Sequence, residues 1–179
     1  MDAQRGRTNR RSFLLTAGLP LLAVGGGMTY LLWPESDPGR EPDWRRVRTD
    51  LEPLNKGFGA YLGELTDAHW LGYDVDEAKY GDRSIPSPDS RIRLVGVAHL
   101  APGGAASVVG TPGRTFAAAV PSEPPTPLAP YLPADQAWQR SPEFDAQANS
   151  ETSGGYQSGE YLIDVRRDLV YFDVLYFTT

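Results

Sequence analysis

Histidine, serine and clustered carboxylates are the side chains of this sequence that could do chemistry. The chain has two histidines, His69 and His99, and no cysteine. The lack of cysteine excludes a disulfide, a thiol nucleophile and a cysteine-bound zinc ion. A three-ligand zinc site would need both histidines and a carboxylate, and their spacing matches no zinc motif. We therefore expect each to be a packed or surface histidine, and we predict no metal or cofactor.

Ser158 stands in a run that resembles the nucleophile elbow of hydrolases. Residues 155–159 read Gly-Tyr-Gln-Ser-Gly, but the elbow needs a glycine two residues before the serine, where Tyr156 stands. A larger side chain at that place would clash in the sharp turn. We therefore predict no nucleophile and no catalytic residue here.

Three carboxylates, Asp74, Asp76 and Glu77, lie within four residues, as they would in a calcium loop. An EF-hand loop continues with a third ligand, a turn glycine and a closing glutamate, whereas Lys79 and Tyr80 follow here. We interpret the cluster as a solvated acidic loop.

Asp164 and Asp173 lie in strongly apolar stretches near the end of the chain. A carboxylate in such a stretch is exposed, paired or functional. We expect exposure on an outer sheet face, with Arg91 or Arg93 as the available partner.

The first 33 residues predict export. Residues 1–11 are a basic region, and residues 12–33 are free of charge and long enough to span a membrane as a helix. Arginines before such a segment stay in the cytoplasm, which places residues 43–179 outside, joined by a proline-containing tether at 34–42. Residues 10–15 also resemble a twin-arginine export signal. The alternative is a cleaved signal peptide, with residues 23–25 as the cleavage site.

Charge makes nucleic acid a poor partner for the exported part. The whole chain carries a formal charge of −6 and residues 1–33 carry +3, which leaves −9 on residues 34–179. An acidic surface repels a phosphate backbone. The expected partners are the membrane, through residues 12–33, and another envelope protein.

Hydrophobic patterns in residues 43–179 predict one α+β domain, a small antiparallel sheet with one or two helices packed on one face. Apolar spacing predicts a helix over residues 43–54 with Asp43 as its N-cap and a short helix over 102–109. Residues 58–70 are ambiguous between a helix and a strand, and we interpret them as weakly helical. Alternation over residues 91–100 predicts a strand. Residues 80–89 and 149–155 are expected to be loops.

The proline-rich stretch 121–142 is predicted to pack across the sheet and to bury Trp138 and Phe144. The chain then ends in a predicted hairpin of residues 159–165 and 170–178. A four-residue loop would place Asp164 and Asp173 on one face and keep the other apolar. A two-residue turn would set Glu160 opposite Asp173, which is unfavourable for like charges.

Three segments resemble a group of small uncharacterised actinobacterial proteins that are exported or membrane-anchored. They are residues 86–91 (Pro-Ser-Pro-Asp-Ser-Arg), the spacing Trp138-x-x-Ser141-x-x-Phe144, and Leu162-x-Asp164 followed by residues 170–172 (Val-Tyr-Phe). The resemblance implies no reaction, ligand or catalytic residue.

The sequence therefore predicts a non-catalytic, membrane-tethered binding or interaction module of the cell envelope. The alternative is a hydrolase of envelope material that uses two carboxylates from Asp74, Asp76, Asp164 and Asp173. Such a pair would have to face one cleft, about 5 to 9.5 Å apart.

Overall fold

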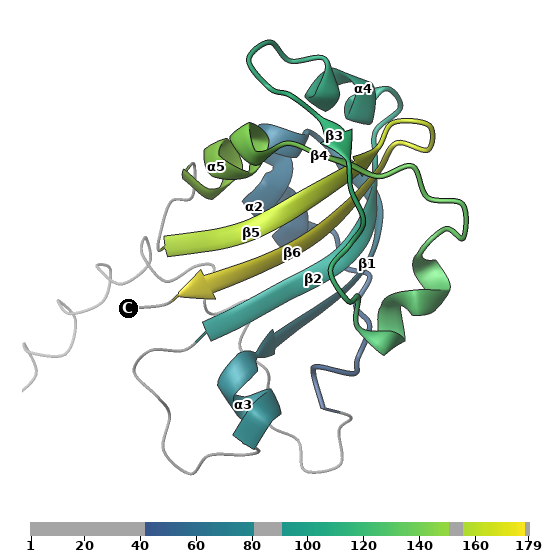
Figure 1. Ribbon diagram of the computed structural model, residues 1–179. Helices are drawn as coiled ribbons and strands as arrows, with labels where there is room; N and C mark the ends of the chain where they lie inside the picture. The colour runs from purple at the N-terminus through teal and green to yellow at the C-terminus, as the bar shows by residue number, and fades with distance from the viewer. Residues whose placement is uncertain (1–41, 81–90, 151–155, 178–179) are drawn as a thin grey trace, which may run out of the picture. The chain divides into compact units, whose positions relative to one another are not determined.

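The computed structural model describes residues 42–80, 91–150 and 156–177. They form an α+β fold around one antiparallel sheet with the strand order β1-β2-β6-β5-β4-β3 (Figure 1), so the predicted fold class is confirmed. The strands are β1 (Leu65–Asp74), β2 (Arg91–Leu100), β3 (Ala117–Ala118), β4 (Gln139–Arg140), β5 (Tyr156–Asp164) and β6 (Leu169–Phe177). The helices are α2 (Glu52–Leu62), α3 (Val75–Tyr80), α4 (Gly104–Val109), the 3₁₀-helix η1 (Thr126–Tyr131) and α5 (Pro142–Ser150).

Several predictions fall on residues that the structure does not describe. The membrane segment 12–33, nearly all of the tether and the loop at 81–89 lie outside the described residues. Within the described ranges, no helix has the length and apolar character needed to cross a membrane.

The first helix begins nine residues later than predicted. Residues 43–45 form a turn instead of a helix start, and Arg48 pairs with Trp70 of β1. Pro53 decides the boundary, because proline lacks an N–H and fits the first turn, where that group has no helical partner. Helix α2 ends at Leu62 and is capped by Gly63, whose φ of 83° suits glycine.

The weak helix predicted over residues 58–70 is half wrong. Residues up to Leu62 are helical, but β1 begins at Leu65. The side chain of Asn55 accepts a hydrogen bond from the Leu65 N–H at 2.8 Å and donates one to the Leu65 carbonyl at 3.0 Å. This double contact fixes the place where the chain leaves α2 and enters the sheet.

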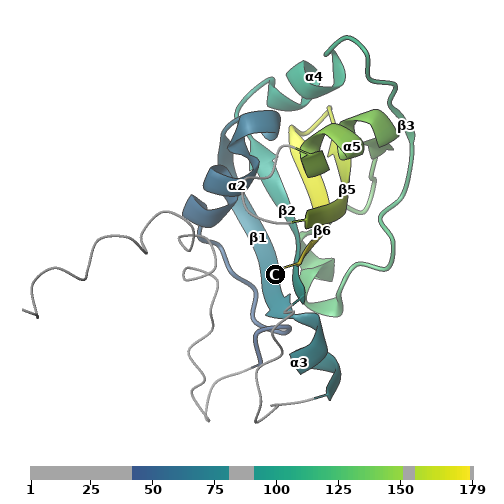
Figure 2. The ribbon, with the colours of Figure 1, turned by 90° about the vertical axis from the view of Figure 1, so that its left-hand side faces the viewer.

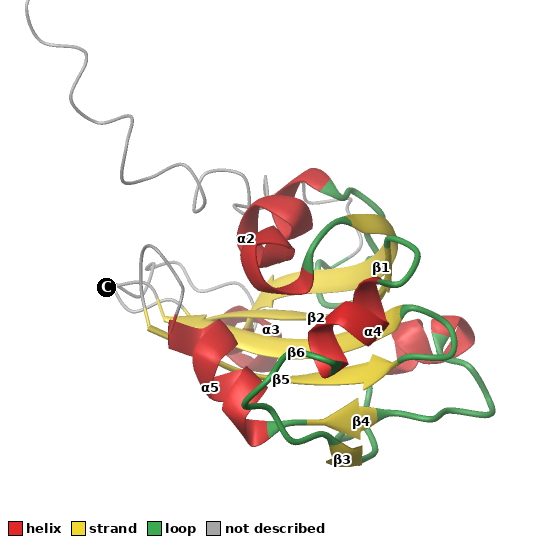
Figure 3. Ribbon diagram, turned by 90° about the horizontal axis from the view of Figure 1, so that it is seen from above, coloured by secondary structure: helices red, strands yellow, loops and turns green. Residues whose placement is uncertain are grey.

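Helices α2, α4 and α5 cover one face of the sheet (Figure 3). Aromatic rings fill this layer: Phe58 of α2 packs edge-on against Phe172 at 5.1 Å, and Phe144 of α5 against Tyr161 at 5.6 Å. Gly96 makes room for the start of the Trp70 side chain, since a Cβ there would lie 2.5 Å from the Trp70 Cβ. The predicted short helix near 102–109 is confirmed as α4.

The other face of the sheet is crossed by residues 121–138, which we call the strap (Figures 1 and 2). Leu128 of η1 and Trp138 are buried against Leu71, Val97 and Tyr171 of three strands. The predicted burial of Trp138 is therefore confirmed. Phe144 is also buried, but by α5 on the opposite face, so the predicted cause was wrong for that residue.

The terminal hairpin of β5 and β6 is confirmed, but its predicted register was wrong by two residues. Asp164 pairs with Leu169, and Glu160 stands directly opposite Asp173. The loop has four residues, as predicted, but they are 165–168 and not 166–169, which gives the strand pairing expected for the rejected two-residue turn. Asp168 in this loop has a φ of 50°, a conformation that aspartate tolerates. Arginines permit this register: Asp173 binds Arg93, and Glu160 binds Arg140.

Candidate functional site

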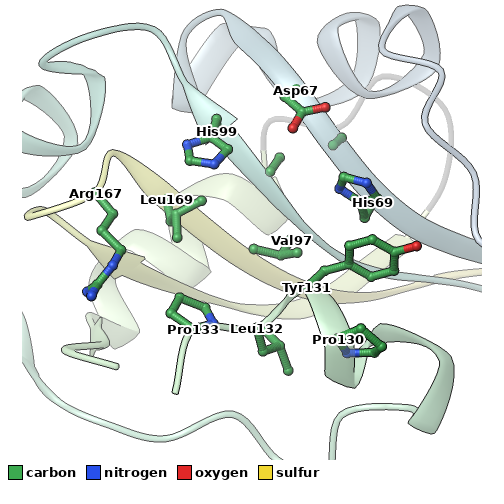
Figure 4. Close-up of a pocket in the computed structure, with 12 residues that line it drawn as sticks. Asp67, His69, Val97, His99, Pro130, Tyr131, Leu132, Pro133, Arg167 and Leu169 are labelled. Atoms are coloured by element: carbon green, nitrogen blue, oxygen red, sulfur yellow. The ribbon is translucent and has the colours of Figure 1, made fainter. Parts of the chain in front are cut away.

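A pocket of about 330 Å³ lies where the strap crosses β1 and β2, and both histidines of the chain line it (Figure 4). We call it the histidine pocket. Its lining residues are Asp67, Ala68, His69, Val97, Ala98, His99, Pro130, Tyr131, Leu132, Pro133, Arg167 and Leu169. The strands supply the floor and the polar groups, and the strap supplies one wall.

Strand pairing brings the polar groups of the pocket together. Asp67 stands opposite His99 across the β1–β2 ladder, and His69 follows two residues after Asp67 on the same face. A β-bulge between Leu65 and Asp67 makes this possible, because the extra residue shifts every later side chain to the other face. Leu65 is thus buried, whereas Asp67 faces the strap side.

The strap wall is held by one buried leucine and one ring stack. Leu128 is fully buried under η1, and two to five residues later the chain lines the pocket with two prolines, Tyr131 and Leu132. The rings of Tyr131 and His69 stack with centroids 3.9 Å apart and an interplanar angle of 18°. Tyr131 remains 41% exposed, so the stack leaves much of this side chain accessible.

Arg167 closes the opposite end of the pocket, but its charge is already neutralised. Its guanidinium donates to the Asp135 carboxylate at 2.6 Å and to the Asp164 carboxylate at 3.1 Å. These contacts hold the pKa of Arg167 above its usual value, mainly through the hydrogen bond with Asp135. Arg167 therefore shapes the pocket and is committed to protein partners.

Three polar side chains in the pocket have no such commitment. Among residues 42–80, 91–150 and 156–177, the carboxylate of Asp67 and the imidazoles of His69 and His99 make no hydrogen bond or ion pair. No described group of three His, Asp or Glu side chains is arranged to hold a metal ion. The pocket therefore offers one acceptor and two groups that can donate or accept, beside an apolar floor.

The acidic cluster at residues 74–77 is not the loop that the sequence suggested. Residues 75–80 form α3, and the Asp74 carboxylate accepts a hydrogen bond from the Asp76 N–H at 2.7 Å. Asp76 in turn forms an ion pair with Arg91 at 2.6 Å. Neither aspartate lines the histidine pocket.

Ser158 lies within β5, opposite Leu175 of β6, and not on a strand-to-helix turn. It does not line the histidine pocket either.

Asp164 and Asp173 share one sheet face, as predicted, but neither is simply exposed. Asp173 receives two hydrogen bonds from Arg93, at 2.8 and 2.5 Å, so the expected Arg93 partnership is confirmed. Asp164 is fully buried and accepts from the backbone N–H groups of Ala137 and Arg166 as well as from Arg167. The predicted exposure on a wet face is therefore wrong.

A second polar row runs across the same face next to the strap. Within the described residues, Glu160 has one buried carboxylate oxygen without a hydrogen-bond partner, and the hydroxyl of the buried Tyr171 likewise has none. Burial, reinforced by the nearby Asp173 charge, raises the pKa of Tyr171 well above its usual value. Neither residue lines the histidine pocket, so we do not assign these atoms to that site.

Sequence reasoning treated the two histidines singly and missed the pocket. Their separation of thirty residues shows no motif, and β1 was taken for a weak helix. The available signal was the alternation of polar Asp67 and His69 with apolar Ala68 and Trp70, which is typical of a half-buried strand. The chain matches no protein-family model, no curated protein and no solved structure.

Proposed function

We propose that this chain is a membrane-tethered, extracytoplasmic module that binds an envelope component at the histidine pocket without transforming it. The anchor and the location come from residues 1–33, whose basic start and uncharged stretch favour a span with residues 43–179 outside.

The observation that carries the binding role is the set of polar groups left unused in the pocket. Asp67, His69 and His99 face a cavity without a protein partner, in a domain whose other described carboxylates near the sheet are mostly paired with arginine. Asp67 and His99 are exposed and His69 is half-buried, so a ligand in the pocket can form hydrogen bonds with all three side chains.

The alternative of a carboxylate-dependent hydrolase receives no support from the pocket. It required two of Asp74, Asp76, Asp164 and Asp173 to face one cleft, and none of them lines the cavity. Asp67 is the pocket's carboxylate, and the two-carboxylate mechanism has no second one there. We therefore propose no reaction.

A pull-down of the full chain from detergent-solubilised envelope tests the binding role. Tyr131→Ala removes an exposed ring from the pocket wall and should abolish capture of whatever the wild-type chain retains. Trp44→Ala is the matched control, because Trp44 is also an exposed aromatic residue, at 37%, and does not line the pocket. Capture that survives Tyr131→Ala, or that is lost with Trp44→Ala instead, would reject the pocket as the binding surface.

A further inference from the structure

We infer that the ligand of the histidine pocket is a neutral sugar ring, one unit of an envelope glycan. This inference rests on the proposed binding function and names the chemical class that the pocket would select. Its size agrees, since about 330 Å³ lies at the small end of the roughly 300–1,000 Å³ range of ligand pockets.

The pocket combines two kinds of surface that a sugar ring also combines. Its floor is apolar, formed by the side chains of Val97 and Leu169, and can contact the C–H face of a ring. Asp67, His69 and His99 stand around that floor and can exchange hydrogen bonds with hydroxyl groups, which both donate and accept. A wholly apolar ligand would leave these three side chains buried without partners.

Charge argues against an anionic ligand. Arg167 is the arginine of the pocket, and its guanidinium is bound to Asp135 and Asp164. Residues 34–179 carry a formal charge of −9, and one of their carboxylates, that of Asp67, stands at the site itself. A phosphate or carboxylate ligand would therefore meet a negative surrounding without a free arginine to offset it.

A metal ion would require a different arrangement of the same side chains. Among the described residues no three ligands stand close enough to share an ion, and the ring of His69 lies against Tyr131. A sugar needs no convergence on one point, because its hydroxyl groups are spread around the ring. It suits side chains that stand apart, as Figure 4 shows for Asp67, His69 and His99.

Nuclear magnetic resonance of the imidazole groups tests this inference on the full chain, because its two histidines give two sets of signals and both lie in the pocket. The chain is kept in a detergent without a sugar head group, so that the micelle does not compete. The probes are maltose, N,N′-diacetylchitobiose and methyl α-mannoside, each raised to about 50 mM, an excess even over a millimolar Kd. Inorganic phosphate and Zn²⁺ are added in separate titrations.

We expect at least one sugar to shift the signals of both histidines along a saturating curve, and phosphate to shift neither. Tyr131→Ala should lower the affinity for that sugar by about tenfold or more, whereas Trp44→Ala should leave this affinity unchanged. The inference is overturned if all three sugars leave both signals in place, or if Zn²⁺ or phosphate saturates the site and no sugar does. A pocket-dependent capture in the pull-down together with that negative result would reject the sugar and keep the binding function.

Discussion

Asp164 shows how one buried carboxylate can organise three separate parts of the chain. It ends β5, accepts the N–H of Ala137 at the end of the strap, and accepts from Arg166 and Arg167 in the hairpin loop. Arg167 is thereby held at the end of the histidine pocket. Asp164, which the sequence offered as a candidate functional carboxylate, thus has a structural role. It affects the histidine pocket through its contact with Arg167.

Replacement of Asp164 by alanine should destabilise the domain by about 2–4 kcal/mol, because it leaves two backbone N–H groups and part of Arg167 without their acceptor. Asp135→Ala is the control, since Asp135 binds the same arginine from a side chain that is 74% exposed, and it should have little effect. Urea unfolding of both variants measures the difference. Equal losses would show that Asp164 does not hold this junction.

Glu143 gives the domain a predictable sensitivity to acid. The hydroxyl of the buried Ser141 donates to the Glu143 carboxylate at 2.7 Å and, with backbone N–H groups, lowers the pKa of Glu143 below its ordinary 4.5. A lowered pKa means that the charged form stabilises the fold, and this contribution is lost as the pH falls through the lowered value. Glu143→Gln should therefore lose less stability than wild type between about pH 7 and about pH 3. Identical losses in urea unfolding at the two pH values would contradict this role.

The two histidines mark the limit of sequence reasoning at the scale of single residues. Each was expected to be a packed or surface histidine, and the structure places His69 at a half-buried and His99 at an exposed position of its strand. Their shared pocket depends on the β1–β2 pairing and on the bulge before Asp67. Neither feature has a signature in the spacing of His69 and His99 along the chain.

At the scale of elements, the hairpin register was predicted wrongly because charge was judged from two strands alone. Glu160 opposite Asp173 is unfavourable by itself. The neighbouring strands supply Arg93 and Arg140, so that each of the two facing carboxylates has an arginine on its outer side. Those arginines become available only when β2 pairs with β6 and β4 pairs with β5, and the prediction of the hairpin in isolation could not include them.

The same row gives a test of the register. Arg93→Gln should destabilise the domain by about 1–3 kcal/mol, because two facing carboxylates then lack one of their cations on a half-buried surface. Adding Asp173→Asn removes the unpaired charge, so the double variant should be more stable than Arg93→Gln alone. Urea unfolding of the wild type, both single variants and the double variant completes the cycle. A double variant that is less stable than Arg93→Gln would show that facing charges are not what the arginine relieves.

Strands were easier to predict than helix boundaries for a physical reason. The alternation over residues 91–100 corresponds to the two faces of the sheet, and the predicted strand is confirmed as β2 with the same bounds. The apolar spacing of residues 43–54 matched a helix by chance, while Pro53 marked the true start of α2. A proline is tolerated in the first turn of a helix but not in a later turn. A prediction that had given Pro53 more weight would therefore have placed the boundary correctly.

At the scale of the whole described domain, the strap turns one face of the sheet into a site. Without residues 121–138, Leu71, Val97 and Tyr171 would lose the cover of Leu128 and Trp138. The sequence predicted this packing from the apolar residues within a proline-rich stretch. It did not predict that the edge of the strap would leave a cavity over β1 and β2, because cavities depend on three-dimensional fit.

Leu128→Ala should therefore cost about 2–5 kcal/mol and loosen the strap, since it removes a fully buried side chain from the core. Limited proteolysis should then cut residues 121–138 of the variant faster than those of the wild type. Val120→Ala is the control, because that side chain is 81% exposed and its loss should change neither stability nor cleavage. Rapid cutting of the wild-type strap would mean that it does not cover the sheet in solution.

The central claim is that the binding surface of this domain is the histidine pocket, and photo-crosslinking in intact cells tests it most directly. A benzophenone amino acid replaces Tyr131 in the pocket wall or, as the control, the equally accessible Trp44. We expect irradiation to attach envelope material to the chain substituted at position 131 and not to the chain substituted at position 44. Adducts from position 44 alone, or from neither position, would contradict the claim.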